Sequence, residues 1–276
     1  MEWIMNSTHG FLAMRVVQAA IVVFPVQFSL VSGVEPTVNS TVKLPLSPEF
    51  VTEPRIRGIG KPIRWKGQEY DVASGIDVLM NVIRDLEKGK DRELAFVTLS
   101  MSARDLEGRP CLDELARLYD DEIDLQKQAI LICFQGSADP RGLPVFIRTL
   151  EDSRDLKLRL WAAQGLAHWN IRRGVAEIVA MLESDELMPQ PSRMYYARDN
   201  AVESFTKANT RKGWGFPDGE LRKSIAGKTD LDDQQKAALF ITEVKKWFSE
   251  NEHRFPDWKL GDALPEITPP EQEARP

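Results

Sequence analysis

The sequence predicts an all-α protein whose core is a short stack of helical hairpins. Three observations predict this class. Similar units recur along the middle of the chain at spacings of 31 and 32 residues. Apolar residues within each unit follow a helical spacing, and Gly or Pro separates one unit from the next. Because a single hairpin of this kind cannot bury its apolar face, neighbouring hairpins are expected to stack and share one core.

The composition predicts a globular protein with an acidic surface. The chain has 276 residues, of which 42% are hydrophobic and 28% are charged. A chain of this length can bury a core without disulfides or metals. The net charge of -6 opposes binding to nucleic acid, whose phosphates require clustered Lys and Arg. The two cysteines form no CxxC pair and the three histidines lie far apart. No metal and no bound cofactor is therefore expected.

Residues 1–33 read as a targeting segment. An apolar run from Val16 to Gly33 follows Arg15 and ends in small residues, which is the pattern of a secretory signal peptide cleaved after Gly33. Gln and Pro interrupt the run and weaken it as a membrane-spanning helix. An uncleaved anchor and a buried N-terminal helix are the alternatives, and a start at Met14 is a further hypothesis. The protein is then exported, to the periplasm or the cell exterior, and touches a membrane only through an uncleaved segment.

Two further segments lack a helical pattern. Residues 34–73 are rich in Pro, Thr, Val and Gly and predict an extended leader with room for a short strand. Residues 253–276 predict a disordered tail. The hairpins are expected over residues 74–208, and the first begins near Ser74, where Ser74 and Asp77 resemble a helix-capping pair.

The clearest unit opens with residues 139–142 (DPRG) and contains two helices. The first, helix A, runs to about Leu150 and is followed by a polar turn. The neighbouring units open at Cys111 and Gly174. The second helix of the unit, helix B, carries small and apolar residues at helical spacing: Leu158, Ala162, Ala163, Leu166 and Ala167.

This unit resembles a known repeat. Residues 139–144 (DPRGLP), followed by Leu158-Arg159 and then two alanines, are similar to HEAT repeats of the short, PBS-lyase type. The resemblance extends less closely to the flanking units, and it departs at Gln126, where the family usually has Arg. It implies a right-handed α-solenoid of about four HEAT-like hairpins, in which the B helices line the concave surface.

Residues 209–252 carry a separate pattern. An aromatic turn with Trp214 and Phe216 precedes a capped helix that contains Trp247 and Phe248. A stack of hairpins needs a cap over its last apolar face, so these rings are expected to close the stack rather than to contact a ligand. A similar turn and helix often end exported bacterial HEAT-repeat proteins.

A polar stripe on the B helices is the candidate binding face. Trp161, Gln164 and His168 share one side of a helix at positions i, i+3 and i+7. Trp161 is the predicted anchor, because exposed Trp is enriched at binding hot spots. The alternative is that Trp161 packs inward and the stripe is only solvated. The repeat register places equivalent residues in the two adjacent units: Gln128, Leu131 and Gln135, and Asn200, Glu203 and Lys207.

The two cysteines allow two interpretations. Cys111 opens one predicted helix and Cys133 lies near the end of the next, so a hairpin with its turn near Glu122 places them opposite each other. An exported protein permits a disulfide between them. The alternative is a pair of small buried hydrophobic side chains.

No catalytic constellation emerges from the sequence. The acidic residues 120–124 fall in a predicted turn without the pattern of a calcium loop, and no G-x-S-x-G elbow occurs. The first functional hypothesis is a non-catalytic protein–protein interaction scaffold of an extracytoplasmic compartment. The second is an enzyme-associated or cofactor-carrying subunit, as the resemblance to lyase-like HEAT proteins implies. DNA binding, a third alternative, is opposed by the acidic charge and the export signal.

Overall fold

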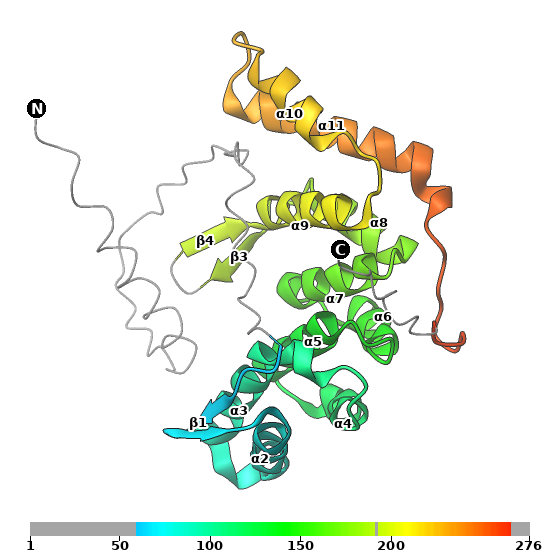
Figure 1. Cartoon of the computed structure of the whole chain (residues 1–276). Helices are drawn as coiled ribbons and strands as arrows, with labels where there is room; N and C mark the ends of the chain where they lie inside the picture. The colour runs from blue at the N-terminus through cyan, green and yellow to red at the C-terminus, as the bar shows by residue number, and fades with distance from the viewer. Residues whose placement is uncertain (1–58, 191–192, 266–276) are drawn as a thin grey trace, which may run out of the picture.

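The computed structural model describes residues 59–190 and 193–265 (Figure 1). The targeting segment predicted over residues 1–33 and the first part of the predicted leader lie outside these residues. Most of the described chain is helical, with two short β-hairpins, which confirms the predicted all-α class. Within the described residues no helix has the length and apolar character needed to cross a membrane.

The described chain begins with a β-hairpin. β1 (Ile63–Trp65) and β2 (Gln68–Tyr70) pair antiparallel, and the β1 side chains Ile63 and Trp65 are buried. The last part of the predicted leader is therefore a folded hairpin. It leads directly into α2 (Val72–Arg84).

The cap of α2 differs from the predicted one. Asp71 is the N-cap residue, and its carboxylate accepts the backbone N–H of Ser74 at 3.0 Å. Ser74 is thus the third residue of the helix, and the predicted pairing of Ser74 with Asp77 is wrong. The carboxylate of Asp71 satisfies a helix N–H better than a pair inside the first turn, where the backbone is already helical.

Eight of the described helices form four consecutive pairs. The second helices of the pairs pack side by side in chain order (Figure 1). Short 3₁₀ turns connect some of the helices: η1 (Leu86–Lys88), η2 (Ala103–Leu106) and η3 (Tyr119–Asp121). The pairs are α2 with α3 (Gly89–Met101), α4 (Cys111–Leu118) with α5 (Asp124–Ser137), α6 (Gly142–Asp152) with α7 (Leu156–His168), and α8 (Arg172–Met181) with α9 (Ala197–Lys212).

Two glycines make the same contact in successive pairs. A Cβ added to Gly142 would lie 2.7 Å from the Cβ of Phe134, and one added to Gly174 would lie 2.4 Å from the Cβ of Leu166. Both contacts join the start of a first helix to the preceding second helix. Any side chain at these two positions would overlap the preceding helix. Because glycine has no Cβ, the two helices can pack closely. The 32-residue repeat of the sequence is therefore also a repeat of packing.

Two arginines, one buried and one half-buried, also make the same contact in different pairs of helices. Arg92 of α3 donates to the carbonyl of Ile83 at 2.7 Å, and Arg159 of α7 donates to the carbonyl of Leu150 at 2.8 Å. Each carbonyl lies nine residues earlier, near the end of the preceding helix. Each guanidinium also pairs with a glutamate further along the chain: Glu122 for Arg92 and Glu177 for Arg159. The two arginines thus tie the first pair of helices to the second and the third pair to the fourth.

α5 lacks this arginine. Gln126 occupies the corresponding place, and its side-chain oxygen Oε1 is buried without a hydrogen-bond donor among the described residues. A glutamine is too short and carries no charge, so it does not form the tie that Arg92 and Arg159 form. This departure from the repeat pattern is the one that the sequence predicts at Gln126.

The last helices gather an aromatic cluster. α10 (Asp218–Ala226) and α11 (Asp233–Asn251) follow α9 and lie at one end of the stack, opposite β1 and α2 (Figure 1). Trp247 stacks on Trp214 at 6.4 Å between ring centroids and packs edge-on against Phe205 at 5.8 Å. Helix α10 was not predicted. The cluster contains Phe205, Trp214, Phe216, Phe240, Trp247, Phe248 and Phe255.

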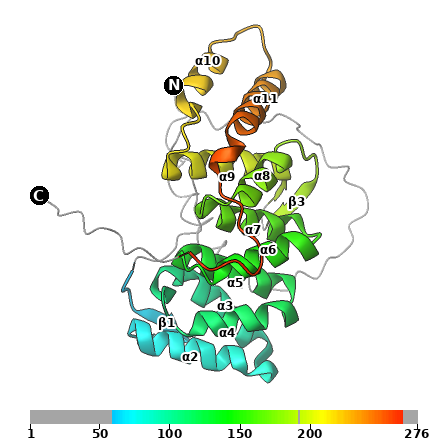
Figure 2. The same ribbon diagram turned by 90° about the vertical axis from the view of Figure 1, so that its right-hand side faces the viewer.

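The segment that follows α11 is folded. After η4 (Glu252–Arg254), the chain runs back along the stack (red in Figure 2), and Phe255 and Trp258 are buried. The N–H of Arg172 donates to the carbonyl of Pro256 at 2.9 Å, and the Arg172 guanidinium pairs with Asp257 at 2.9 Å. The prediction of a disordered tail from residue 253 is therefore wrong for this part, because its two large rings bury apolar surface. The end of the predicted tail, residues 266–276, lies outside the described residues.

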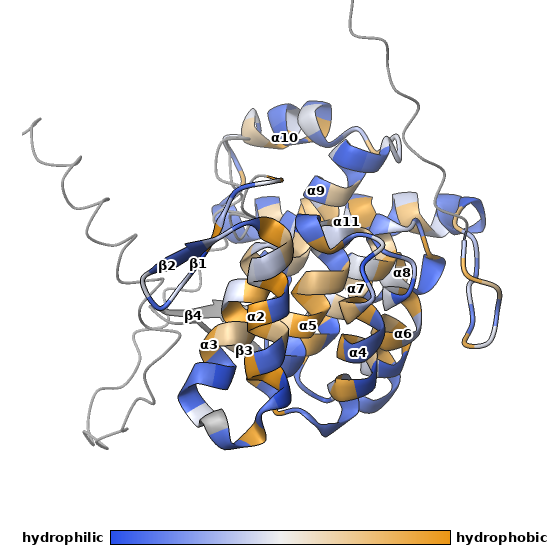
Figure 3. Ribbon diagram, turned by 60° about the horizontal axis from the view of Figure 1, so that its bottom comes forward, coloured by the Kyte–Doolittle hydropathy of each residue, from blue (hydrophilic) through white to orange (hydrophobic). Residues whose placement is uncertain are grey.

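A second β-hairpin interrupts the last pair of helices. β3 (Leu187–Gln190) pairs antiparallel with β4 (Arg193–Tyr196) and connects α8 to α9. Figure 3 shows hydrophobic residues along α5, α6 and α7 and hydrophilic residues in the turns between helices. This distribution is the one expected when paired helices share a single core.

Candidate functional site

One side of α7 carries four half-buried residues. Lys157, Trp161, Gln164 and His168 follow one another at spacings of four, three and four residues, which keeps them on one side of the helix. Three of these are the predicted stripe. Lys157 was missed, although its position four residues before Trp161 continues the same spacing.

Hydrogen bonds join α7 to both neighbouring helices. The Nε2 of Gln135 donates to the Oε1 of Gln164 at 3.3 Å, and the Nε2 of Gln164 donates to the Oγ of Ser204 at 2.6 Å. Ser204 in turn donates to the carbonyl of Asn200 at 2.6 Å. The structure thus brings residues of all three predicted stripes together. Ser204, which the sequence reasoning missed, is the link on α9.

The remaining predicted residues lie around this chain of hydrogen bonds. Trp161 packs partly against the hydrophobic core and is partly exposed, and Gln128 of α5 is half-buried. Leu131, the register equivalent of Gln164, is fully buried and interrupts the stripe on α5. Glu203 and Lys207 form an ion pair at 2.8 Å on α9. We call this surface the B-helix face; it comprises Gln128, Gln135, Lys157, Trp161, Gln164, His168, Asn200, Glu203, Lys207 and Lys212.

His168 is uncharged at neutral pH. Burial, together with the positive charge of Lys212 at the end of α9, lowers the pKa of His168 to about 4. Its ring lies edge-on to the ring of Trp169 at 6.4 Å between centroids. A neutral imidazole offers one hydrogen-bond donor and one acceptor. At neutral pH, His168 therefore adds polarity but no charge to the B-helix face.

The two lysines at the ends of this face are partly desolvated. Burial lowers the pKa of Lys157, and the nearby carboxylate of Asp155 only partly opposes the shift. Burial and the charge of Arg211 lower the pKa of Lys212. Neither amine forms an ion pair with any residue that the structure describes. The face therefore holds two lysines that form no ion pair with a described residue, although the Asp155 carboxylate acts on Lys157.

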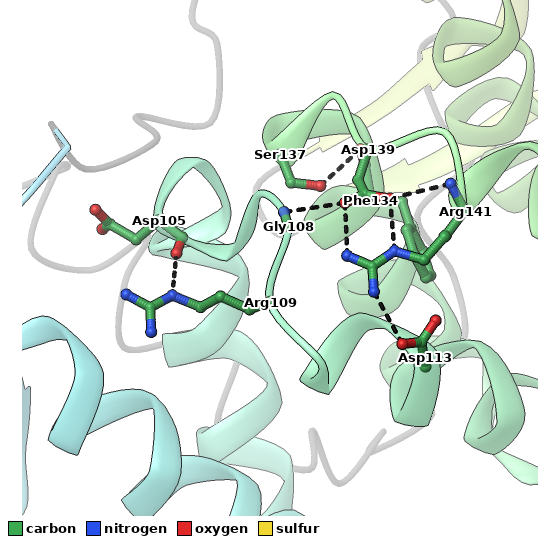
Figure 4. Close-up of polar contacts among 8 residues, drawn as sticks. All are labelled: Asp105, Gly108, Arg109, Asp113, Phe134, Ser137, Asp139 and Arg141. Atoms are coloured by element: carbon green, nitrogen blue, oxygen red, sulfur yellow. Dashed lines mark hydrogen bonds and ion pairs between the residues drawn. The ribbon is translucent and has the colours of Figure 1, made fainter. Parts of the chain in front are cut away.

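A second polar cluster lies where the α4–α5 and α6–α7 pairs meet (Figure 4). The buried carboxylate of Asp139 accepts the N–H of Gly108 at 3.1 Å, the N–H of Arg141 at 3.0 Å and the Arg141 guanidinium at 2.7 and 2.8 Å. The same guanidinium reaches Asp113 of α4 at 2.9 Å. Burial alone would raise the pKa of Asp139, but these hydrogen bonds outweigh it and lower the pKa. Since every carboxylate contact is used to hold loops together, the cluster is a structural clamp.

The two cysteines are not bonded, and Cys111 lies near Arg141 of this clamp. Cys111 and Cys133 are both free thiols in the structure. Burial raises the pKa of Cys133, and the neighbouring Cys111 contributes to the rise. Burial also raises the pKa of Cys111, against the opposing charges of Arg109 and Arg141. A raised pKa makes both thiols poor nucleophiles, so neither is suited to catalysis.

The comparisons with known proteins identify no relative. The chain matches no protein-family model, and no curated protein or solved structure matches it. In the described residues, no group of three or more His, Cys, Asp or Glu side chains is arranged to hold a metal ion. The HEAT-like resemblance, the export signal and the cofactor-carrying alternative all stay predictions.

Proposed function

We propose that this protein is a non-catalytic interaction scaffold of an extracytoplasmic compartment, and that it binds a protein partner on the B-helix face. The proposal includes a right-handed α-solenoid of HEAT-like hairpins, with α3, α5, α7 and α9 as its B helices. The repeated glycine and arginine contacts support this reading, because successive repeats of a solenoid contact each other in the same way.

One observation carries the proposal. The hydrogen bonds from Gln135 to Gln164 and from Gln164 to Ser204 hold three helices in register around a partly exposed Trp161. Fixed side chains lose little conformational entropy when a partner binds, and a Trp ring offers a large contact area. A surface of this kind suits protein recognition. His168, the one histidine of this face, has a pKa of about 4 and is therefore a weak base.

The test is an affinity capture from the native envelope fraction. The full chain is tagged at its C-terminus, and bound proteins are identified by mass spectrometry for the wild type and for Trp161→Ala. Trp161→Phe is the conservative variant, and Leu86→Ala removes an exposed side chain (75% exposed) away from the face. The expected result is a specific partner that is lost with Trp161→Ala and kept with the other two.

Two results would contradict the proposal. A partner that is captured equally by Trp161→Ala would remove Trp161 as the anchor and the B-helix face as the binding surface. A coloured or small-molecule ligand that co-purifies without any protein partner would favour the cofactor-carrying alternative.

A further inference from the structure

The charge pairing of this chain is uneven. Several half-buried cations of the described structure have carboxylate partners: Arg92 with Glu122, Arg141 with Asp139, Arg159 with Glu177 and Arg222 with Asp218. A partly buried charge without a partner costs free energy, which explains why such pairs are formed. Lys157 and Lys212 are two exceptions, because no described carboxylate forms an ion pair with either amine.

Both exceptions lie on the B-helix face. Lys157 shares one side of α7 with Trp161 and Gln164, and Lys212 lies close enough to His168 to act on its charge. The one carboxylate of the face, Glu203, is already paired with Lys207. The face therefore carries a net positive charge, although the whole chain has a net charge of -6.

We propose that the B-helix face binds an acidic, extended peptide segment of a partner protein, whose carboxylates pair with Lys157 and Lys212. This inference rests on the proposed function and names the chemistry of its ligand. The partner supplies carboxylates that form ion pairs with these two amines, which no described residue does. Trp161 and the amide side chains between them contact the middle of the segment.

The helix geometry sets the spacing of the carboxylates. Lys157 and His168, beside which Lys212 lies, are eleven residues apart on α7. At a rise of 1.5 Å per residue this separation is about 16 Å. An extended peptide advances about 3.3 Å per residue, so about five residues span the distance. The expected ligand has two acidic positions separated by about four residues, with an apolar or aromatic side chain between them.

The probes are fluorescein-labelled synthetic peptides, and binding to the full chain is measured by fluorescence anisotropy. One peptide has two Glu-Glu pairs separated by four residues that include one Leu, and a second has Gln in place of every Glu. The acidic peptide is expected to bind at least about tenfold more tightly at low salt and to lose this advantage at high salt. A third peptide, with its four Glu adjacent, tests the predicted spacing and is expected to bind more weakly than the first.

The variants locate the binding. Lys157→Gln/Lys212→Gln is expected to weaken binding of the acidic peptide about tenfold. Lys157→Arg/Lys212→Arg keeps the charge and is expected to keep most of the affinity. Lys223→Gln/Lys228→Gln removes two exposed lysines elsewhere, with the same change in net charge, and is expected to leave binding unchanged. Circular dichroism confirms that each variant is folded.

The outcomes separate this inference from the proposed function. Equal binding of the acidic and Gln peptides, equal weakening by the two Lys→Gln double variants, or binding of single-stranded DNA in place of the peptides would overturn the acidic-segment inference. If the captured partner is nevertheless lost with Trp161→Ala, the scaffold function stands and only the ligand chemistry is wrong. A partner that ignores Trp161→Ala overturns the function itself.

Discussion

The two ends of the helical stack are held together by different physical means. Between the first two pairs of helices, the buried Arg92 reaches the carbonyl of Ile83 and the carboxylate of Glu122. At the other end, seven aromatic rings pack mostly edge-to-face, and the fully buried Phe205 contacts three of them. A polar tie depends on one residue at one place, whereas an aromatic cluster spreads its stabilisation over many contacts.

This difference explains how a repeat can vary. Gln126 replaces the arginine in α5, so the contact to a carbonyl and a glutamate is absent there. The buried Oε1 of Gln126 has no hydrogen-bond donor among the described residues. The neighbouring Arg92–Glu122 pair and the Asp139 clamp still hold that part of the stack. In the aromatic cluster, the loss of one ring leaves the contacts among the other rings in place. Phe205, the most buried ring with several contacts, is the exception.

The largest expected effect is the loss of that central ring. Phe205 is fully buried and touches Trp214, Phe216 and Trp247. Phe205→Ala should reduce the free energy of unfolding by about 4 kcal/mol, because it leaves a cavity that the surrounding rings cannot fill. Urea denaturation measures the change. A loss as small as that of Phe248→Ala, whose ring is half-buried at the edge of the cluster, would show that the cluster has no centre.

The removal of a polar tie should have the next largest effect. The side chains of Arg92 and Glu122 are 11% and 6% exposed, so Arg92→Ala leaves a nearly buried carboxylate without its partner. The expected loss is about 3 kcal/mol. Arg159→Ala is the matched comparison and should cost less, because the Arg159–Glu177 pair is more exposed. Equal losses for the two variants would mean that burial does not govern these ties.

The Asp139 clamp predicts a pH dependence of stability. The pKa of Asp139 is lower in the folded protein than its ordinary value, because its hydrogen bonds outweigh the effect of burial. The clamp therefore contributes fully above the pKa of the unfolded chain, and its contribution is lost as the pH falls through the folded pKa. Asp139→Asn should lower stability by about 2 kcal/mol at neutral pH. Its deficit relative to the wild type should shrink at acidic pH, and a deficit that is constant with pH would contradict the role of the charge.

The smallest expected effect is a gain in stability at position 126, where glutamine replaces the repeated arginine. Gln126→Leu removes the buried Oε1 that has no described donor while it keeps a similar volume. The variant should raise the free energy of unfolding by about 1 kcal/mol, since the cost of the unpaired acceptor disappears. Thermal denaturation of the wild type and the variant under the same conditions measures this gain. Destabilisation by Gln126→Leu would show that the glutamine has a partner in solution.

The repeated part of the fold could be predicted because its signals are local. α4 begins at Cys111 and α6 at Gly142, the residues at which the sequence repeat opens its units. The glycine at each opening and the small residues of the B helices carry the packing pattern in the sequence itself. The register pairs Gln164 with Leu131 and Gln135 with His168, so the hydrogen bond between Gln135 and Gln164 joins positions one turn apart in the predicted stripes.

The missed features depend on contacts between distant residues. Trp258 lies in a polar segment that resembles a disordered tail, and only the contact of that segment with Arg172 shows that it folds back. The β1–β2 hairpin is similarly supported by packing on α2, which strand propensity alone does not reveal. That Lys157 forms no ion pair with a described residue could not be predicted either, because it depends on where the folded chain places its carboxylates.

Site-specific photo-crosslinking in the native cell tests the central claim, binding on the B-helix face, most directly. A photoreactive amino acid replaces Gln128 on the face in one strain, and the exposed residues Leu86 or Ile123 in two control strains. The proposed function predicts a discrete crosslinked partner from position 128 and none from positions 86 and 123. Crosslinks from the control positions alone would place the partner on the turns between helices and contradict the claim.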